Sequence, residues 1–517
     1  MRKVDWKSLW DSAGNRFLPA ALLRFWTFVP MFQNYFVTKW HSVFCHLYIF
    51  GECLPRQFHI IPHHWYKYLF SICLDNQYIY YFCGLIVIGN KQSQKSHIMD
   101  IFERISKDLG GPIGMYREQA DGYFAFPRLE GELGPRMVFN GKEVLCWSLN
   151  NYLGLANHPA IRKADAEGAA RWGLAAPMGA RMMSGHTRMH EHFEKELADF
   201  EKKEAAYLFN FGYQGIVSTL DSLLNRHDVL IFDAEIHACL QDGKRLHIGK
   251  SFSFKHNDMA SLEQKLKVAT EVVKETGGGI LVITEGVYGM TGALGDLAGI
   301  AALKKKYNFR ILIDDAHGFG VMGPNGRGTS EHFGVMDDID LYIGAYAKSM
   351  AIIGGFVAGP KYIIDYLRYN MRSQMYAKSL PLAIVEGCEK RLEIIRSAEG
   401  DQLRAQLWKV TRALQNGFRN LGFDIGPAEA CVTPVHVQGD VVQATNIAMD
   451  LRENYRIFCS VVMYPVIPKG MIIFRVIPTA AHSMEDVEYT LNAFAEVKEK
   501  LAKGYYDGDK VPNMAIL

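Results

Sequence analysis

The chain has 517 residues, 49% hydrophobic and 22% charged, so it can bury at least one large core and is not a disordered protein. Its net charge is only +2, and its basic residues are interleaved with acidic ones, which argues against nucleic-acid binding. The nine cysteines show no C-x-x-C spacing and fit free thiols in a reducing compartment. We therefore expect a cytoplasmic protein of two or more domains, without a metal site.

Residues 1–98 differ in composition from the rest of the chain. They hold ten Lys and Arg against four Asp and Glu, and 22 of the 63 aromatic residues. Their apolar runs between charges are shorter than the roughly 17–25 residues that a membrane-spanning helix needs. Two interpretations remain open. The segment is a peripheral membrane-surface contact, or it is an upstream stretch wrongly included in the reading frame, which we favour because its helical periodicity is weak.

From residue 99 onward, stretches with helical periodicity alternate with short apolar runs. This alternation predicts an α/β fold with a mainly parallel sheet. Expected helices lie at 190–204, 261–275 and 298–307, and expected buried strands lie at 279–284, 310–313 and 356–359. Polar residues adjoin each of these strands. Because ligands in such folds gather at the carboxyl ends of strands, we expect a site there.

A smaller α+β domain is predicted after residue 380. Helical stretches are expected at 386–396, 402–421 and 484–501, with strands between the last two. The predicted division of the chain is therefore an N-terminal extension (1–98), an N-terminal arm (99–145), a large domain (146–380), a small domain (381–504) and a tail (505–517).

Two local patterns carry the chemistry. Asp314 and His317 follow an apolar strand within Asp-Asp-Ala-His, where acidic residues are also common as helix caps. Lys348 lies in the small-residue segment Gly-Ala-Tyr-Ala-Lys-Ser-Met. Although a single lysine on a loop is usually a surface residue, a desolvated lysine has a lowered pKa and becomes a nucleophilic amine that can form a Schiff base.

Taken together, these segments resemble the α-oxoamine synthases, which are fold-type-I pyridoxal-phosphate (PLP) enzymes, over residues 139–501. The resemblance implies that Lys348 holds PLP as a Schiff base and that Asp314 pairs with the pyridinium nitrogen, which keeps the ring protonated. It also implies that His317 contacts the ring hydroxyl and that His237 stacks on the ring face. These four residues are the expected catalytic group.

The same resemblance extends to the phosphate and to the substrate. Backbone N–H groups of Gly212 and Tyr213, at a helix start, would hold the cofactor phosphate, and Arg475 would grip the substrate carboxylate in a fork-to-fork pair. Two positions depart from the family pattern. Gly289 stands where many relatives have a serine that contacts the cofactor, and Ala345 stands where a threonine often binds phosphate. We therefore expect weaker cofactor affinity.

By this resemblance, the chain condenses an amino acid with an acyl-coenzyme A thioester and releases carbon dioxide, with Lys348 as the base that removes the α-proton. A homodimer is expected. The leading interpretation is serine with a long acyl chain, as in serine palmitoyltransferase and the first step of sphingolipid synthesis. The alternatives within the family are glycine C-acetyltransferase and 8-amino-7-oxononanoate synthase. A noncatalytic partner subunit and a plain aminotransferase are the alternatives of other classes.

Overall fold

The computed structural model describes residues 100–107, 120–462 and 471–508. By its contacts the chain divides into two units, 1–104 and 105–517. Nearly all of the first unit, including the compositional boundary predicted at residue 98, lies outside the described residues. Helix α6 (Ile101–Lys107) begins the described chain. Among the described residues, none of the helices combines the length and the apolar character needed to cross a membrane.

The second unit is built on a seven-stranded sheet in the order β4-β10-β9-β8-β7-β5-β6. Its strands are β4 (Ala205–Phe209), β5 (Val229–Asp233), β6 (Lys250–Phe254), β7 (Ile280–Glu285), β8 (Arg310–Asp314), β9 (Leu341–Ala345) and β10 (Gly355–Gly359). Neighbours from β6 to β9 pair in parallel, whereas β10 is antiparallel to both β4 and β9. The predicted mainly parallel α/β fold is therefore confirmed.

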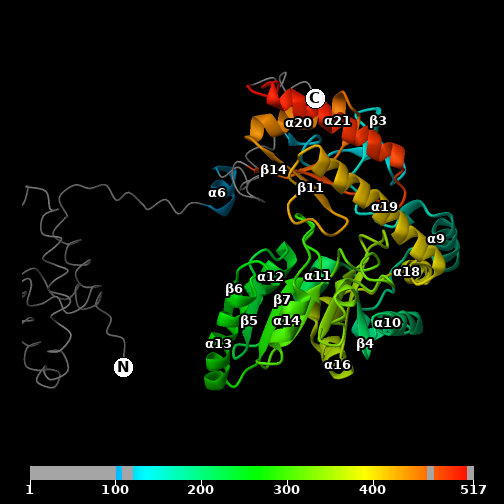
Figure 1. The fold of residues 1–517 in the computed structure, drawn as a ribbon. Coiled ribbons are helices and arrows are strands. Elements are labelled where there is room, and N and C mark those ends of the chain that lie inside the picture. The colour runs from blue at the N-terminus through cyan, green and yellow to red at the C-terminus, as the bar shows by residue number, and fades with distance from the viewer. Residues whose placement is uncertain (1–99, 108–119, 463–470, 509–517) are drawn as a thin grey trace, which may run out of the picture. The chain divides into compact units, whose positions relative to one another are not determined.

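Helices cover both faces of this sheet because alternate strand residues point to opposite sides. In β5, Val229 and Ile231 join one buried cluster and Leu230 another. The first cluster takes in side chains of α10 (Arg188–Phe200), α13 (Met259–Thr276), α14 (Leu297–Leu303) and α18 (Leu382–Ile395), and the second takes in side chains of α11 (Gly212–Leu223), α12 (Ala238–Leu246) and α16 (Lys361–Asn370). Figure 1 shows this arrangement around the sheet.

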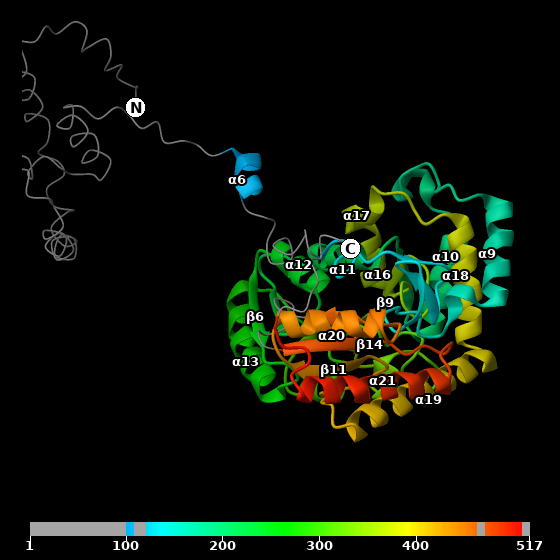
Figure 2. The same cartoon turned by 90° about the horizontal axis from the view of Figure 1, so that it is seen from above.

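The rest of the unit forms two smaller sheets. One is antiparallel with the order β11-β14-β13, and the other has the order β1-β2-β3-β12. Their strands are β1 (Leu129–Glu130), β2 (Arg136–Phe139), β3 (Lys142–Cys146), β11 (Thr433–Gln438), β12 (Ile457–Phe458), β13 (Ser460–Val462) and β14 (Met471–Val476). Three helices pack around β11 and β14 (Figures 1 and 2): α19 (Ala398–Asn420), α20 (Val441–Glu453) and α21 (Met484–Ala502).

The chain before the large sheet also contributes to this smaller part. Strand β12 pairs in parallel with β3 through Ile457 and Leu145, and Trp147 belongs to the same buried cluster as the core residues of α19 and α21. In the described part of the chain, the remaining α-helices are α9 (Pro159–Trp172), α15 (Thr329–His332) and α17 (Arg372–Met375). The domain boundaries predicted at 145, 380 and 504 stay predictions.

The expected elements are present, with ends that shift by a few residues. Helix α10 ends at Phe200 rather than at residue 204, because Lys202 adopts a positive φ of 52° that stops the helix. Helix α14 ends at Leu303 and continues as a turn. The antiparallel direction of β10 matters for function. Because β9 ends and β10 begins at the same edge, the loop between them lies at the carboxyl edge of the parallel strands.

Candidate active site

Most of the predicted site residues lie at or near the carboxyl edge of the central sheet. Asp233, Glu285, Asp314 and Ala345 are the last residues of β5, β7, β8 and β9. Glu285 and Asp314 are register partners on adjacent strands. Lys348 lies in the turn that leads from β9 to β10. The sheet thus brings together acids and an amine that are far apart in the sequence.

Asp314 is almost fully buried, with 4% of its surface exposed. Its Oδ1 accepts a hydrogen bond from the Ala316 N–H at 3.1 Å, and its Oδ2 accepts one from the Cys239 thiol at 3.6 Å. The same sulfur lies 2.9 Å from Nδ1 of His237. Burial raises the pKa of Cys239, and Asp314 raises it further, so Cys239 keeps its thiol proton and donates it in a hydrogen bond to Asp314.

Lys348 is half-buried in the turn after β9. Burial lowers the pKa of its amine, while Asp314, Cys239 and Glu285 oppose that shift. The Glu285 carboxyl is buried. Its pKa lies well above the usual value, mainly because of this burial and next because of the negative charge of Asp314. A lysine with a lowered pKa holds more of the neutral amine at neutral pH, which is the nucleophilic form.

His317 follows β8 and is held from one side by a tyrosine. Its Nδ1 shares a 2.6 Å hydrogen bond with the hydroxyl of Tyr152, and Tyr152 is fully buried. Burial lowers the pKa of His317 well below its ordinary value, and the nearby cations Lys348 and Arg475 lower it further. The imidazole is therefore neutral at physiological pH.

His237 is placed by the start of a helix. It is the N-cap residue of α12, where its Nδ1 accepts a hydrogen bond from the Cys239 N–H at 3.3 Å. Its own N–H donates to Oε1 of Glu285 at 2.5 Å. The residue is exposed, and its ring meets that of Tyr213 edge-on at 6.1 Å. The His237 imidazole thus lies beside Tyr213, and its backbone is tied to Glu285 at the end of β7.

Helix α11 presents its N-terminus to the same edge. It begins at Gly212, and its first helical backbone bond runs from the Gly215 N–H to Phe211, so the N–H groups of the first turn before it have no partner within the helix. A Cβ at Gly212 would lie 3.2 Å from the Ala345 side chain. The helix start therefore contacts the end of β9, next to the loop that carries Lys348.

Arg475 comes from β14, outside the central sheet. Its Nε donates to the carbonyl of Gly289 at 2.6 Å, and its Nη2 donates to Oδ1 of Asn150 at 3.2 Å. It is 8% exposed, yet no carboxylate of the described residues forms an ion pair with it. A buried guanidinium with donors to spare is suited to binding an anion.

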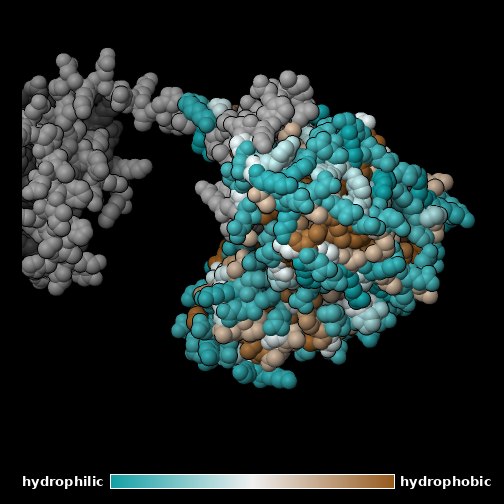
Figure 3. Space-filling view, turned by 45° about the horizontal axis from the view of Figure 1, so that its top comes forward, coloured by the Kyte–Doolittle hydropathy of each residue, from teal (hydrophilic) through white to brown (hydrophobic). Residues whose placement is uncertain are grey.

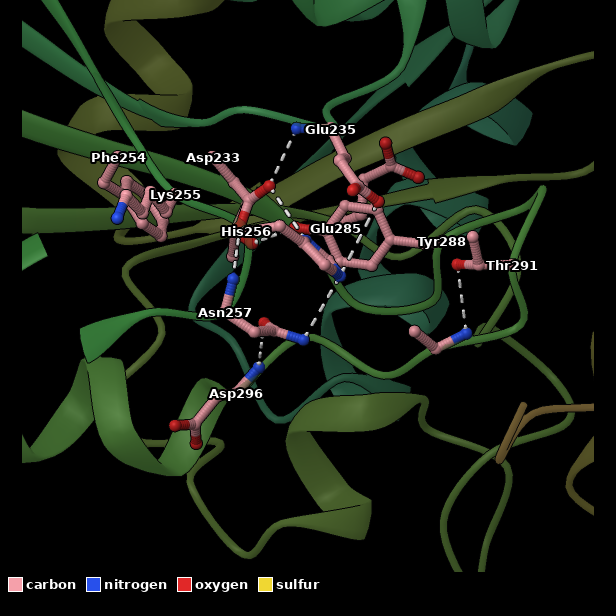
Figure 4. Close-up of polar contacts among 12 residues, drawn as sticks. Asp233, Glu235, Phe254, Lys255, His256, Asn257, Glu285, Tyr288, Thr291 and Asp296 are labelled. Carbon is pink, nitrogen blue, oxygen red and sulfur yellow. Dashed lines mark hydrogen bonds and ion pairs between the residues drawn. The ribbon is translucent and has the colours of Figure 1, made fainter. Parts of the chain in front are cut away.

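The turn at residues 286–292, which carries Gly289, is fastened to the neighbouring loops (Figure 4). His256 contacts the ring of Tyr288 edge-on at 4.4 Å and bonds to buried Asp233 at 3.0 Å. Asn257 donates to the Leu294 carbonyl at 2.8 Å. The loop after β6 thereby holds the turn that positions Arg475.

The structure brings Lys348, Asp314, His317, His237 and Arg475 into one region, linked by shared partners and mutual charge effects. The polar groups that hold these side chains were not predicted from the sequence. The contact of Tyr152 with His317 joins positions 165 residues apart, so local sequence gives no sign of it. Asn150 and Cys239 gave no signal that a sequence alone could distinguish from ordinary packing.

PLP fits these groups. The edge offers an amine with a lowered pKa, a buried carboxylate, two imidazoles with lowered pKa values and N–H groups at a helix start that have no partner within the helix. The amine matches the aldehyde of PLP, the carboxylate matches its ring nitrogen, and the helix N–H groups match its phosphate. Within the described ranges, no cluster of His, Cys, Asp and Glu side chains could hold a metal ion.

Comparison with known proteins places the chain among related sequences and structures. The model of the family "Aminotransferase class I and II" matches residues 142–494. A cysteate-C-fatty acyltransferase from Capnocytophaga ochracea is 56% identical, over 79% of this chain and 96% of the relative. A serine palmitoyltransferase from Bacteriovorax stolpii is 35% identical, over 73% and 88%. A solved structure of SPT with PLP as an internal aldimine is 26% identical, with a TM-score of 0.71, and 78% of this chain and 99% of that one are covered.

Proposed function

Because this chain belongs to the aminotransferase class I and II family, as a PLP-dependent acyltransferase of the α-oxoamine synthase type, we propose that it condenses cysteate with a fatty acyl thioester and releases carbon dioxide. The observation that carries the choice of substrates is the 56% identity to a cysteate-C-fatty acyltransferase across nearly its full length. Serine, our expectation from the sequence, is the second candidate, supported by the relative from Bacteriovorax stolpii.

Bound PLP supplies an electron sink for the α-carbon of the substrate. In our proposal the chain's own residues prepare that chemistry. The Nζ atom of Lys348 binds the cofactor and, when released from it, takes the α-proton of the amino acid. The lowered pKa of Lys348 suits both tasks, since the neutral amine is the nucleophile and the base.

Asp314 holds a proton on the ring nitrogen in this proposal. Its carboxylate is buried and already oriented by the Ala316 N–H and the Cys239 thiol, so it can face a positive charge without reorganisation. His317 and His237 contact the hydroxyl and one face of the ring. The N–H groups of Gly212 and Tyr213 bind the phosphate at the start of α11.

Arg475 is the proposed partner of the substrate carboxylate. Its guanidinium is buried, fixed at Nε and Nη2 by Gly289 and Asn150, and without a carboxylate partner among the described side chains. A fixed fork of this kind pairs with a carboxylate through two parallel hydrogen bonds. Every amino acid brings that carboxylate, so Arg475 selects the class of substrate and not its side chain.

The amino-acid preference is tested with purified protein, PLP and palmitoyl-coenzyme A. Cysteate, serine, alanine and glycine are supplied separately and at equal concentration, and the products are identified and quantified by mass spectrometry. We expect the cysteate product to dominate. A dominant serine product would support the second candidate. In parallel reactions with a short acyl thioester in place of palmitoyl-coenzyme A, condensation there alone would favour the glycine C-acetyltransferase or 8-amino-7-oxononanoate synthase type. Amino-group transfer to added pyruvate would favour an aminotransferase.

We also propose that the protein is a homodimer. Three large apolar side chains are strongly exposed around η3 (Arg181–Gly185): Leu174 at 70%, Met178 at 79% and Met183 at 75%. Exposed apolar residues that lie close along the chain are typical of interfaces. Separately, the one face drawn in Figure 3 has hydrophobic residues gathered within an otherwise hydrophilic surface. Light scattering should give twice the chain mass for the wild type and a lower mass for the Met178→Asp, Met183→Asp double variant.

A cytoplasmic location and a peripheral membrane contact through residues 1–98 also stay proposals. That segment lies outside the described residues. Sedimentation of the full chain with anionic lipid vesicles, beside a chain that starts at Met99, would test the contact. Activity and PLP binding should be retained by the shorter chain if residues 1–98 play no part in the fold.

A further inference from the structure

Gly289 lies against the imidazole of His317. A Cβ at position 289 would fall well inside 3.0 Å of the His317 Nε2 and at 3.0 Å from its Cδ2 and Cε1. Real side chains essentially never approach so closely, because repulsion between the atoms rises steeply at that distance. Any residue other than glycine therefore requires that either His317 or the turn moves.

The imidazole is not free to move away. Its Nδ1 is tied to the hydroxyl of Tyr152 at 2.6 Å, and Tyr152 is fully buried. The tyrosine hydroxyl also lies 3.4 Å from Oδ1 of Asn150. Displacing His317 would leave a buried hydroxyl with a poorer partner, which costs free energy.

The turn is not free to move either. The Tyr288 N–H donates to the Ala293 carbonyl at 2.9 Å, and the Gly292 N–H donates to the Tyr288 carbonyl at 2.8 Å. The Tyr288 hydroxyl bonds to Thr284 at 2.9 Å, and its ring meets His256 (Figure 4). Arg475 holds the Gly289 carbonyl itself at 2.6 Å.

We infer that Gly289 is a positioning residue, which allows His317 and Arg475 to lie on two sides of one fixed turn. The Gly289 carbonyl orients Arg475. Because Gly289 has no side chain, the His317 ring can occupy the space where a Cβ would lie. This reverses the expectation drawn from the family pattern, in which glycine at 289 is a lost cofactor contact. On the present geometry, restoring the serine of the relatives weakens the hold on PLP. The inference concerns the cofactor and does not depend on which amino acid is the substrate.

A lost cofactor contact at Gly289 predicts that Gly289→Ser tightens PLP binding, whereas a positioning role predicts that it weakens PLP binding. Gly289→Ser and Gly289→Ala proteins are loaded with PLP, and its dissociation is followed by dialysis and visible absorbance. We expect roughly tenfold to hundredfold weaker retention in both variants, the range produced by overpacking a filled site. Gly279→Ala is the control, because a Cβ there would meet only Asp228 at an ordinary 3.8 Å. Equal or tighter PLP retention in Gly289→Ser would overturn the inference.

A double-variant cycle tests the named contact. If the imidazole is what the new Cβ meets, Gly289→Ala should weaken PLP retention much less in a His317→Ala background than in the wild type. An undiminished effect in that background would contradict the proposal. If Gly289→Ala alone fails to fold, the double variant should recover soluble, folded protein, and failure of that rescue would count equally against it.

Discussion

The cofactor side and the substrate side of the site are held in different ways. Asp314 is the last residue of β8, and Lys348 lies in the turn after β9, both in the middle of the seven-stranded sheet. The backbone ladder therefore holds Asp314 and the start of that turn. Arg475 belongs to another sheet, and two hydrogen bonds, to Gly289 and Asn150, hold it at the site. Changes on the cofactor side should therefore abolish chemistry, whereas changes on the substrate side should mainly alter amino-acid affinity.

The largest effect is expected from Lys348→Ala. The variant loses both the covalent attachment of PLP and the proposed base, and a base alone contributes about 10²–10⁴-fold to a rate. Condensation should fall by at least that factor, and the visible absorbance of the protein-bound cofactor should change. The spectrum and the coenzyme A released are measured on the same sample. Undiminished turnover would remove Lys348 from the mechanism.

Arg475→Lys separates the two sides more finely. The variant keeps the positive charge but loses the planar fork, so we expect KM for the amino acid to rise roughly tenfold to hundredfold, the loss typical of a charge-assisted pair. KM for the acyl thioester and PLP retention should stay near the wild-type values. A fall in PLP retention without a change in amino-acid KM would place Arg475 on the cofactor side instead.

A smaller effect is expected from Asn150→Ala. Its amide oxygen supports one donor of Arg475, at 3.2 Å, and a single hydrogen bond of this kind changes affinity by only about tenfold or less. KM for the amino acid should therefore rise by several-fold, with kcat nearly unchanged. Asn151→Ala, one residue along the chain, is a useful comparison because Asn151 bonds to the Ala156 N–H and not to Arg475.

The smallest effect concerns acid stability and comes from a buried histidine that follows β14 in the chain. His482 stacks on Trp147, accepts the Thr479 N–H at Nδ1 and is buried, and this burial lowers its pKa to about 4. Because the unfolded state takes up a proton below the ordinary pKa of 6.5 and the folded state does not, stability should fall as the pH drops from about 6.5 toward 4.

Thermal unfolding followed at pH 7.5, 6.0 and 5.0 should show this loss as a fall in Tm. Each kcal/mol of lost stability should lower Tm by about 2–4 °C, so we expect a fall of a few degrees. A His482→Gln variant should show a shallower decline over the same interval. Parallel decline of the two proteins would assign the acid sensitivity to other groups.

Much of the fold was predictable because its signals are local. Strands β7 and β8 contain continuous apolar runs, at 280–283 and 311–313. Helices α13 and α21 have a clear apolar face and a capping residue, Asp258 or Ser483. The direction of β10 was not predictable, because nothing in Gly-Phe-Val-Ala-Gly distinguishes a parallel from an antiparallel neighbour. Pairing between β12 and β3 was likewise hidden, since it joins residues more than 300 positions apart.

The site divides in the same way. Asp314, His317 and Lys348 were proposed from short motifs after apolar strands, and the structure brings them to one edge. The role of Gly289 could not be predicted from the sequence, because it depends on the position of the His317 imidazole, which follows β8 and is hydrogen-bonded to Tyr152. Residue types report the chemistry, whereas close approaches between loops emerge only in three dimensions.

The central claim, a decarboxylative condensation, is tested most directly by its stoichiometry. Carboxyl-labelled cysteate and palmitoyl-coenzyme A are incubated with the PLP-loaded protein, and coenzyme A and labelled carbon dioxide are counted together. We predict equal amounts of both, dependent on the amino acid and absent from the Lys348→Ala variant. Release of coenzyme A without carbon dioxide, or neither product from a PLP-loaded protein with any of the four amino acids, would contradict the account.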